Sequence, residues 1–183
     1  VVNEVAITHP GTGLKILASP PRPEYAEQVS GEQFVKVVNF LRRMFTYVIV
    51  DTSTYLTDTT LAAIEGSDMV VLLVTQDIPA IKNARLFMNL VRDLKVSPRR
   101  ILFTMNRFDR RIGITPEKVS ESFKHEVAVV IPYDDRVVIP SINRGMPFII
   151  SDKSKPVSRA VLSLAELVRQ RGAELMAEEV QQA

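Results

Sequence analysis

The sequence predicts an α/β protein with a mostly parallel sheet flanked by helices. Short apolar runs rich in β-branched residues occur at Tyr47–Val50, Met69–Val74 and Ile101–Met105. Such runs are typical of strands buried on both faces of a parallel sheet. Helical patterns separate them, the clearest at Ala80–Leu94, where apolar residues recur on one face. Strand and helix patterns therefore alternate along the chain, as they do in parallel α/β sheets.

Two β-prone stretches open the chain, Val1–Thr8 and Leu14–Ala18. Between them, Gly11, Gly13 and Lys15 invite a phosphate-loop interpretation. A phosphate loop needs Gly-Lys-Ser/Thr at the start of a helix, whereas Lys15 is followed by a strand pattern. We therefore predict an ordinary turn here.

The next elements have recognisable boundaries. Ser30 and Gln33 have capping-box spacing and predict a helix that leads into the Tyr47–Val50 strand. A second helix is predicted from about Thr59 to Gly66. Pro79 suits the first turn of the helix that follows the Met69–Val74 strand.

The carboxyl-terminal half continues the alternation. It predicts a short helix at Pro116–Phe123, a buried strand at Val127–Ile131 and a closing helix from Val157 that runs past Gly172. No repeat, low-complexity tract or linker interrupts the sequence, so we expect residues 1–183 to form a single domain.

Composition excludes several classes of function. The chain has no cysteine, and its two histidines are far apart, so thiolate chemistry and an imidazole metal site are not expected. Its longest apolar run, Met69–Val74, is far too short to span a membrane. The formal net charge of +2 gives no argument for nucleic acid.

Polar residues follow three of the predicted strands. They are Asp51 with Thr52, Asn106 with Arg107, and the stretch Pro132–Asp135. Parallel α/β sheets bind ligands at the carboxyl ends of their strands, so these groups predict a ligand site there. A carboxylate followed by hydroxyls can hold a hydrated metal ion or position a water. The alternative for Asp51 is that it caps the helix beginning near Asp58.

Several stretches together resemble the MinD/ParA superfamily of P-loop ATPases. They are Tyr47–Thr52, Thr60–Asp68, Leu102–Arg107, Ile131–Asp134 and Ser141–Pro147, in the order and spacing of that family. Within it, the chain is most similar to the CpaE/TadZ branch of pilus-assembly and localisation proteins. The supporting stretches are Leu17–Glu24, Ile78–Ala84 and Asn106–Ile114.

The resemblance implies roles for particular residues. Asp51 corresponds to the acidic residue that orients the magnesium-bound water, and Thr52 follows it. Asn106 corresponds to the base-recognising asparagine, with Arg107 beside it. Pro132 and Asp134 lie in the segment that resembles the adenine-contacting loop. ATP and Mg²⁺ are therefore the implied cofactors, and Asp51 and Asn106 should open onto one shared cleft.

The family's phosphate loop has no counterpart in residues 1–183. Backbone amides and a lysine of that loop carry most phosphate contacts in P-loop enzymes. We expect residues 1–183 to be the carboxyl-terminal part of a longer ATPase domain, without the first strand and phosphate loop; a lineage that lost the loop is the alternative. ATP hydrolysis is expected in the longer protein and not in this chain alone.

The sequence also departs from the family after Thr52. Many relatives have Pro-Ala-Gly at the next three positions, where this chain has Ser53, Thr54 and Tyr55. A residue other than glycine at position 55 does not freely adopt positive φ. The departure puts in doubt how hydrolysis is coupled to this segment.

Three functions follow. The first is a cytoplasmic ATPase that forms homodimers and positions a membrane-associated machine such as a pilus or a polar-localisation apparatus. The second is a scaffold of the same fold with a degenerate nucleotide site. The third is DNA partitioning through basic residues, for which the sequence offers Arg99, Arg100, Arg107, Arg110 and Arg111.

The carboxyl end bears on membrane attachment. Residues 173–183 contain Glu174, Glu178 and Glu179 and no lysine or arginine, so anionic lipid would repel them. We therefore expect the closing helix to pack on the sheet, with an indirect membrane contact and recruitment to the inner membrane face or cell pole through partners.

Overall fold

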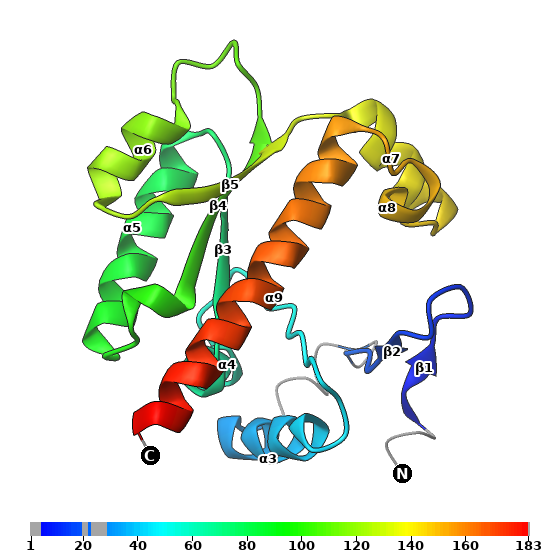
Figure 1. The fold of residues 1–183 in the computed structure, drawn as a ribbon, viewed down its shortest axis with the longest axis vertical. Coiled ribbons are helices and arrows are strands. Elements are labelled where there is room, and N and C mark those ends of the chain that lie inside the picture. Colours follow the sequence, from blue (N-terminus) through cyan, green and yellow to red (C-terminus); the bar gives the residue numbers. More distant parts are fainter. Residues whose placement is uncertain (1–4, 20–21, 23–28, 183) are drawn as a thin grey trace. The chain divides into compact units, whose positions relative to one another are not determined.

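A computed structural model describes residues 5–19, 22 and 29–182, without the side chains of residues 179–182 (Figure 1). The chain divides into two compact units, Val1–Gly66 and Ser67–Ala183, which are described separately below. Residues 1–4 of the first predicted strand and part of the Leu17–Glu24 stretch lie outside the described residues.

The first unit begins with a small antiparallel hairpin. Strands β1 (Ile7–Thr8) and β2 (Lys15–Ile16) pair with each other. Between them, the Gly13 amide donates to the carbonyl of His9 over 2.9 Å, and Gly13 has φ of +72°. This turn position has a left-handed backbone conformation, which glycine adopts without steric cost. The predicted turn is confirmed, and the strands are shorter than expected.

Two helices make up the rest of the first unit. Helix α3 (Gly31–Arg42) has the predicted capping box, with the Ser30 side chain accepting from the Gln33 amide and the Gln33 side chain accepting from the Ser30 amide. It packs against helix α4 (Asp58–Gly66), and a side chain at Gly31 would approach the Asp58 carbonyl to 3.2 Å. Glycine at this position permits the two helices to come close.

The predicted strand at Tyr47–Val50 is not formed. The segment has neither strand nor helix, and Ile49 is 88% exposed. A β-branched run supplies strand propensity, but a strand also needs a neighbour that takes up its backbone hydrogen bonds. No strand within the described part of the first unit pairs with this run.

The second unit is built on a parallel sheet of β3 (Val70–Val74), β4 (Ile101–Phe108) and β5 (Val127–Pro132), in the order β3-β4-β5. These strands confirm the three later strand predictions, although β4 runs three residues further than expected. Because all three are parallel, their carboxyl ends lie along one edge of the sheet.

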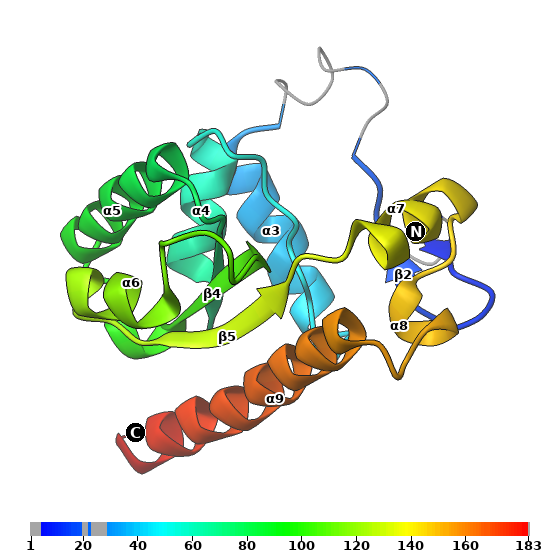
Figure 2. The same cartoon turned by 90° about the horizontal axis from the view of Figure 1, so that it is seen from above.

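Helices cover both faces of this sheet (Figures 1 and 2). Helices α5 (Ile78–Asp93) and α6 (Pro116–Phe123) lie on one face, and α9 (Pro156–Gln182) crosses the other. A 3₁₀ turn, η1 (Pro98–Arg100), leads into β4. The α/β fold is thus confirmed, and α9 packs on β5 as predicted.

Two short helices after β5 were not predicted. They are α7 (Asp135–Arg144) and α8 (Phe148–Ser151), with a turn at Gly145 between them. Neither contains a fully buried residue, and Pro140 lies inside α7. An internal proline argues against a helix from sequence alone, because it removes one backbone donor.

The core of the second unit is centred on β4. Phe103 is only 1% exposed, and its ring centroid lies 5.0 Å from that of Phe123 and 6.4 Å from the ring of His125. Strand β3 differs from expectation, because Val71 and Leu73 are 39% and 54% exposed. β3 is an edge strand of the observed sheet, so only alternate side chains of its apolar run enter the core.

Candidate functional site at the carboxyl edge of the sheet

The three parallel strands end around one cleft. Its volume is about 600 Å³, within the usual range for small-molecule sites. The lining side chains come from the end of β4, from the segments that follow β3 and β4, and from the residue after β5: Thr75, Gln76, Asp77, Arg107, Asp109, Arg111, Ile112 and Tyr133. Within the second unit, side chains from the ends of all three strands therefore meet at this edge.

A β-bulge shapes the end of β4. Met105 pairs with Val130 and Phe108 pairs with Pro132, so β4 has one more residue than β5 between these pairs. Arg107 adopts φ of +53°, and its amide donates to the Asn106 side-chain oxygen over 2.9 Å. Bulges with a left-handed residue redirect side chains and are frequent beside functional sites. Here the bulge directs Arg107 into the cleft.

Arg107 stacks on Tyr133. The guanidinium carbon lies 5.1 Å from the ring centroid, and the same side chain is 3.7 Å from a carboxylate oxygen of Asp135. The Tyr133 hydroxyl donates to Asp135, and this bond is the main cause that raises the pKa of Tyr133. The Tyr133 amide also donates to the Phe108 carbonyl over 2.9 Å, which fixes the two strand ends together.

Gln76 holds the loop that forms one wall of the cleft. Its side-chain nitrogen donates to the Ile114 carbonyl over 2.6 Å, and its oxygen accepts from the Asp109 amide over 2.6 Å. The side chain is only 7% exposed. One buried side-chain amide therefore hydrogen-bonds to the backbone at both ends of the 109–114 loop. This loop contributes Asp109, Arg111 and Ile112 to the lining of the cleft.

Two carboxylates add negative charge to the cleft. Asp77 caps α5, and hydrogen bonds from the Thr75 hydroxyl and the Ala80 amide lower its pKa. Hydrogen bonds from the Arg111 guanidinium and backbone amide lower the pKa of Asp109 to about 2. Both carboxylates are therefore ionised at neutral pH.

The Asp109–Arg111 pair predicts a pH dependence of stability. Because the pKa of Asp109 falls from 3.8 to about 2 on folding, its stabilisation is complete above pH 3.8 and is lost as the pH falls toward 2. Asp109→Asn and Arg111→Gln should each reduce the loss of unfolding free energy over this range. The measurement is urea unfolding at a series of pH values. Arg110→Gln is the control, and a slope that Asp109→Asn leaves unchanged would contradict the prediction.

The predicted base-binding residues lie at this edge, but only Arg107 lines the cleft. Asn106 is half-buried in the bulge beside it. Pro132 pairs with Phe108 at the end of β5, and Asp134 precedes α7 without capping it through its side chain. Tyr133 lies in the predicted stretch Pro132–Asp135 and lines the cleft. The lining residues that sequence reasoning did not assign to this site all follow strand ends, which was the available signal: Thr75, Gln76, Asp77, Asp109, Arg111 and Ile112.

Asp51 and Thr52 belong to the first unit and are exposed, outside any helix or strand. The alternative that Asp51 caps the following helix is wrong. Thr57 has that role, because its hydroxyl accepts from the Thr60 amide over 3.2 Å and its carbonyl accepts from Leu61 over 2.9 Å. The Asp51 carboxylate is therefore not required for the start of α4.

The cleft suits a nucleotide base better than a triphosphate. It offers a planar guanidinium–phenol pair and the apolar side chain of Ile112, and the charges of its lining balance, because Asp77 and Asp109 offset Arg107 and Arg111. Within the described ranges, no three acidic or histidine side chains gather into a metal site. Magnesium is commonly bound by only one or two carboxylates together with substrate phosphates. A single aspartate such as Asp51 is compatible with this kind of coordination.

Comparisons in sequence give one significant relative and no family model that matches the chain. The septum site-determining protein MinD of Thermotoga maritima is 24% identical over 154 residues, which cover 81% of this chain and 56% of that protein. The chain thus spans a little over half the length of this relative.

Comparisons of structure give solved MinD and ParA proteins of similar fold. A ParA family ATPase from Chlorobium tepidum matches with a TM-score of 0.81 at 18% identity, over 89% of this chain and 68% of that one. MinD of Pyrococcus horikoshii, solved with Mg-ADP, matches with a TM-score of 0.78 at 18% identity, over 92% and 68%. The MinC:MinD cell division protein complex of Aquifex aeolicus matches with a TM-score of 0.65 at 20% identity, over 81% of this chain and 60% of that one. The chain is therefore similar in sequence to MinD and has the α/β fold of the MinD and ParA ATPases.

Proposed function

We propose that the strand-end cleft and the adjoining Asn106 bind the base of ATP, as part of a MinD/ParA-type ATPase domain. The observation that carries this proposal is the convergence of the β4 bulge and the β5 end on one cleft in that fold. Asn106 can offer its amide group to the edge of a base, and Arg107 with Tyr133 can offer a flat surface to its face. That a related MinD was solved with Mg-ADP supports the choice of an adenine nucleotide.

The proposed roles follow the sequence prediction. Asn106 and Arg107 contact the base, and Pro132 and Asp134 form the loop beside it. Asp51, with Thr52, would orient a water bound to magnesium. The magnesium ion, when bound with ATP, would neutralise phosphate charge. The chain has no Gly-Lys pair anywhere, so it provides no lysine-bearing phosphate loop. We therefore propose that residues 1–183 bind a nucleotide weakly and do not hydrolyse it alone.

At the level of the cell, we propose that the complete ATPase dimerises and positions a membrane-associated machine, with a pilus of the CpaE/TadZ type as the first candidate. The sequence stretches listed for that branch support the proposal. A MinD solved in complex with MinC shows that an ATPase of this fold engages a protein partner.

A scaffold with a degenerate nucleotide site is the second candidate. Ser53, Thr54 and Tyr55 favour it, because they replace the small residues and glycine that many relatives have here. In the structure, the Ser53 hydroxyl donates to the Tyr55 carbonyl over 3.2 Å, so this segment is engaged in its own local turn. A scaffold would bind no ATP at all.

DNA partitioning is not proposed, because most of the arginines that suggested it have partners. Arg99 pairs with Glu178 at 2.8 Å, and Arg100 donates to the Asp68 carbonyl over 3.3 Å. Arg107 and Arg111 are held within the cleft by Asp135 and Asp109. A phosphate backbone would have to displace these contacts.

The test is binding of a fluorescent ATP analogue to the purified chain. Without a phosphate loop, we expect a dissociation constant on the order of 1 mM, or about −4 kcal/mol. Asn106→Ala should weaken binding about fivefold, because it removes about 1 kcal/mol of hydrogen bonding. Asn83→Ala, an exposed asparagine on α5, is the matched control and should bind as the wild type does.

Two outcomes would contradict this proposal. Absence of any nucleotide binding would favour the scaffold. Steady phosphate release by residues 1–183 that is abolished by Asp51→Ala would show that the chain is a complete enzyme, against the incomplete site proposed here.

A further inference from the structure

The segment from α7 to the start of α9 concentrates positive charge. Between residues 135 and 159 there are five basic side chains and two acidic side chains, a net charge of +3 against +2 for the whole chain. The basic residues are Arg136, Arg144, Lys153, Lys155 and Arg159, and all are exposed. Of the two carboxylates, Asp135 accepts from the Tyr133 hydroxyl and Asp152 accepts from the Ser151 hydroxyl at 2.8 Å.

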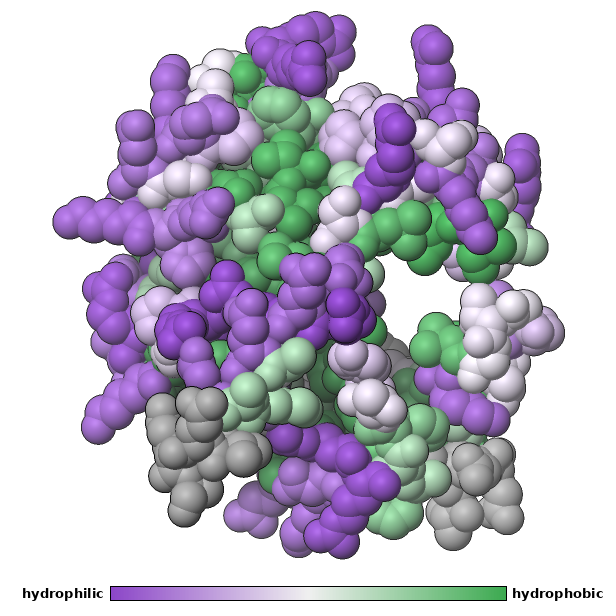
Figure 3. All heavy atoms as spheres, in the orientation of Figure 1, coloured by the Kyte–Doolittle hydropathy of each residue, from purple (hydrophilic) through white to green (hydrophobic). Residues whose placement is uncertain are grey.

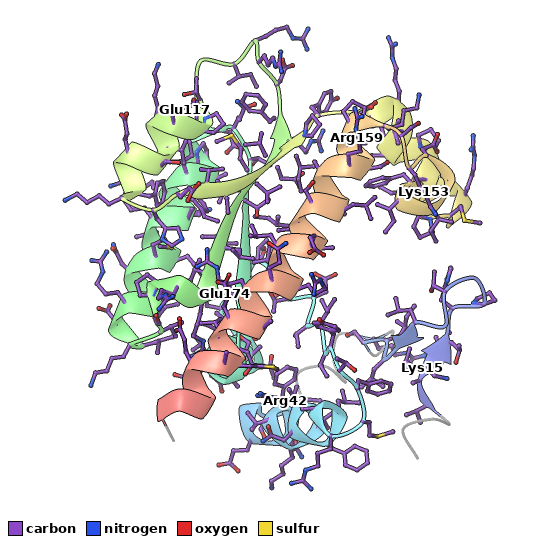
Figure 4. All side chains as sticks on the ribbon, in the orientation of Figure 1. Lys15, Arg42, Glu117, Lys153, Arg159 and Glu174 are labelled. Atoms are coloured by element: carbon purple, nitrogen blue, oxygen red, sulfur yellow. The ribbon has the colours of Figure 1, made fainter. Side chains whose placement is uncertain are left out.

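Among the described residues, these five cations have no carboxylate partner. In the parts of the chain that the structure describes, no acidic side chain pairs with any of them, whereas Arg99, Arg107 and Arg111 all have carboxylate partners. Figure 4 labels Lys153 beside α8 and Arg159 near the start of α9. An unneutralised cluster of this size attracts an extended anionic surface.

The same segment exposes aliphatic side chains. Ile142 is 71% exposed, and the others, which are less exposed, are Ile139, Met146 and Ile150. Ile139 and Ile142 lie three residues apart on one side of α7, and Arg136 lies one turn before Ile139. Figure 3 shows hydrophobic side chains along the edge of the α7–α8 region, with hydrophilic side chains beside them.

We propose that this α7–α8 surface, formed by the four aliphatic residues and five cations above, docks on an anionic membrane. A lipid interface accepts aliphatic side chains between its headgroups while anionic headgroups move laterally to meet fixed cations. Nucleic acid would use the cations but leave the isoleucines in water, because bases are bound by aromatic side chains. The proposal is independent of nucleotide binding, and it adds a direct membrane contact where the acidic carboxyl end predicts only an indirect one.

The test is sedimentation of the full chain with vesicles of phosphatidylcholine, with and without phosphatidylserine. Binding should occur only with phosphatidylserine and should weaken as salt rises. Arg144→Gln and Lys153→Gln should each weaken binding about fivefold, because the attraction of one cation to an anionic surface contributes about 1 kcal/mol to the binding free energy. Ile142→Ser should weaken it about tenfold, because it removes an inserted aliphatic side chain.

Lys82→Gln and Leu86→Ser are matched controls on α5, where both residues are exposed, and they should bind as the wild type does. Thermal unfolding of each variant checks that the exposed substitutions leave the fold intact. Equal binding to both kinds of vesicle, or to neither, would overturn the proposal. Duplex DNA binding that Ile142→Ser does not weaken, without vesicle binding, would assign the cations to nucleic acid instead.

Discussion

Phe103→Ala is expected to lower the free energy of unfolding of the second unit by about 3–5 kcal/mol. The Phe103 ring is 1% exposed at the centre of β4, with Phe123 at 5.0 Å and His125 at 6.4 Å. Truncation removes the transfer energy of the ring and leaves a cavity that the neighbouring strands cannot fill by collapsing. Chemical denaturation followed by circular dichroism measures the change.

This loss is a large part of the total stability of a small domain, so Phe103→Ala could leave no folded protein to measure. Phe103→Leu keeps most of the volume and should cost less than about 1.5 kcal/mol. Leu86→Ala, on the exposed side of α5, is the control and should change stability by less than about 0.5 kcal/mol. A similar loss for Leu86→Ala and Phe103→Ala would show that the core is not centred on β4.

Gln76→Ala should be the most damaging change at the cleft. It leaves the Asp109 amide and the Ile114 carbonyl without their partners, which we expect to cost about 2–3 kcal/mol. The loop between them should then exchange its amide protons faster, above all at Asp109. Denaturation and amide hydrogen exchange together test this, because a purely global effect would change exchange throughout β4 as well.

Gln170→Ala is the matched control for this substitution. Gln170 is exposed on α9, and its side chain donates to Glu166, four residues earlier in the same helix. Its loss should change the unfolding free energy by about 0.5 kcal/mol or less. If Gln76→Ala were as mild as Gln170→Ala, the 109–114 loop would not depend on the buried amide.

Local signals in the sequence predicted most elements of the second unit. Pro116–Phe123 was predicted with the boundaries that α6 has, because Thr115 and Pro116 mark its start. The capping box at Ser30 likewise fixed the start of α3. These elements are specified by residues adjacent in the chain, so a single sequence is enough to find them.

Tyr47–Val50 was mispredicted because strand formation depends on residues that are distant in sequence. Its β-branched residues are as strand-prone as those of β3. However, β3 has β4 beside it, and Tyr47–Val50 has no paired neighbour in the described part of its unit. The exposed side chains of β3 have the same origin, because a run of apolar residues does not reveal whether its strand is central or at an edge.

The candidate site was predicted at the level of the sheet edge and not at the level of single side chains. The parallel order places strand ends together, so Asn106, Arg107 and Pro132 could be grouped from sequence. The bulge that gives Arg107 positive φ, and the buried amide of Gln76 that holds the loop, depend on strand register and packing. Neither leaves a local pattern in the sequence.

Amide chemical-shift mapping of the isotope-labelled chain during titration with Mg-ATP tests the central claim most directly. We predict saturable shifts at Asn106, Arg107 and Tyr133. Shifts confined to other surfaces, or none at the ends of β4 and β5 up to high nucleotide concentration, would contradict the assignment of this cleft to a nucleotide base.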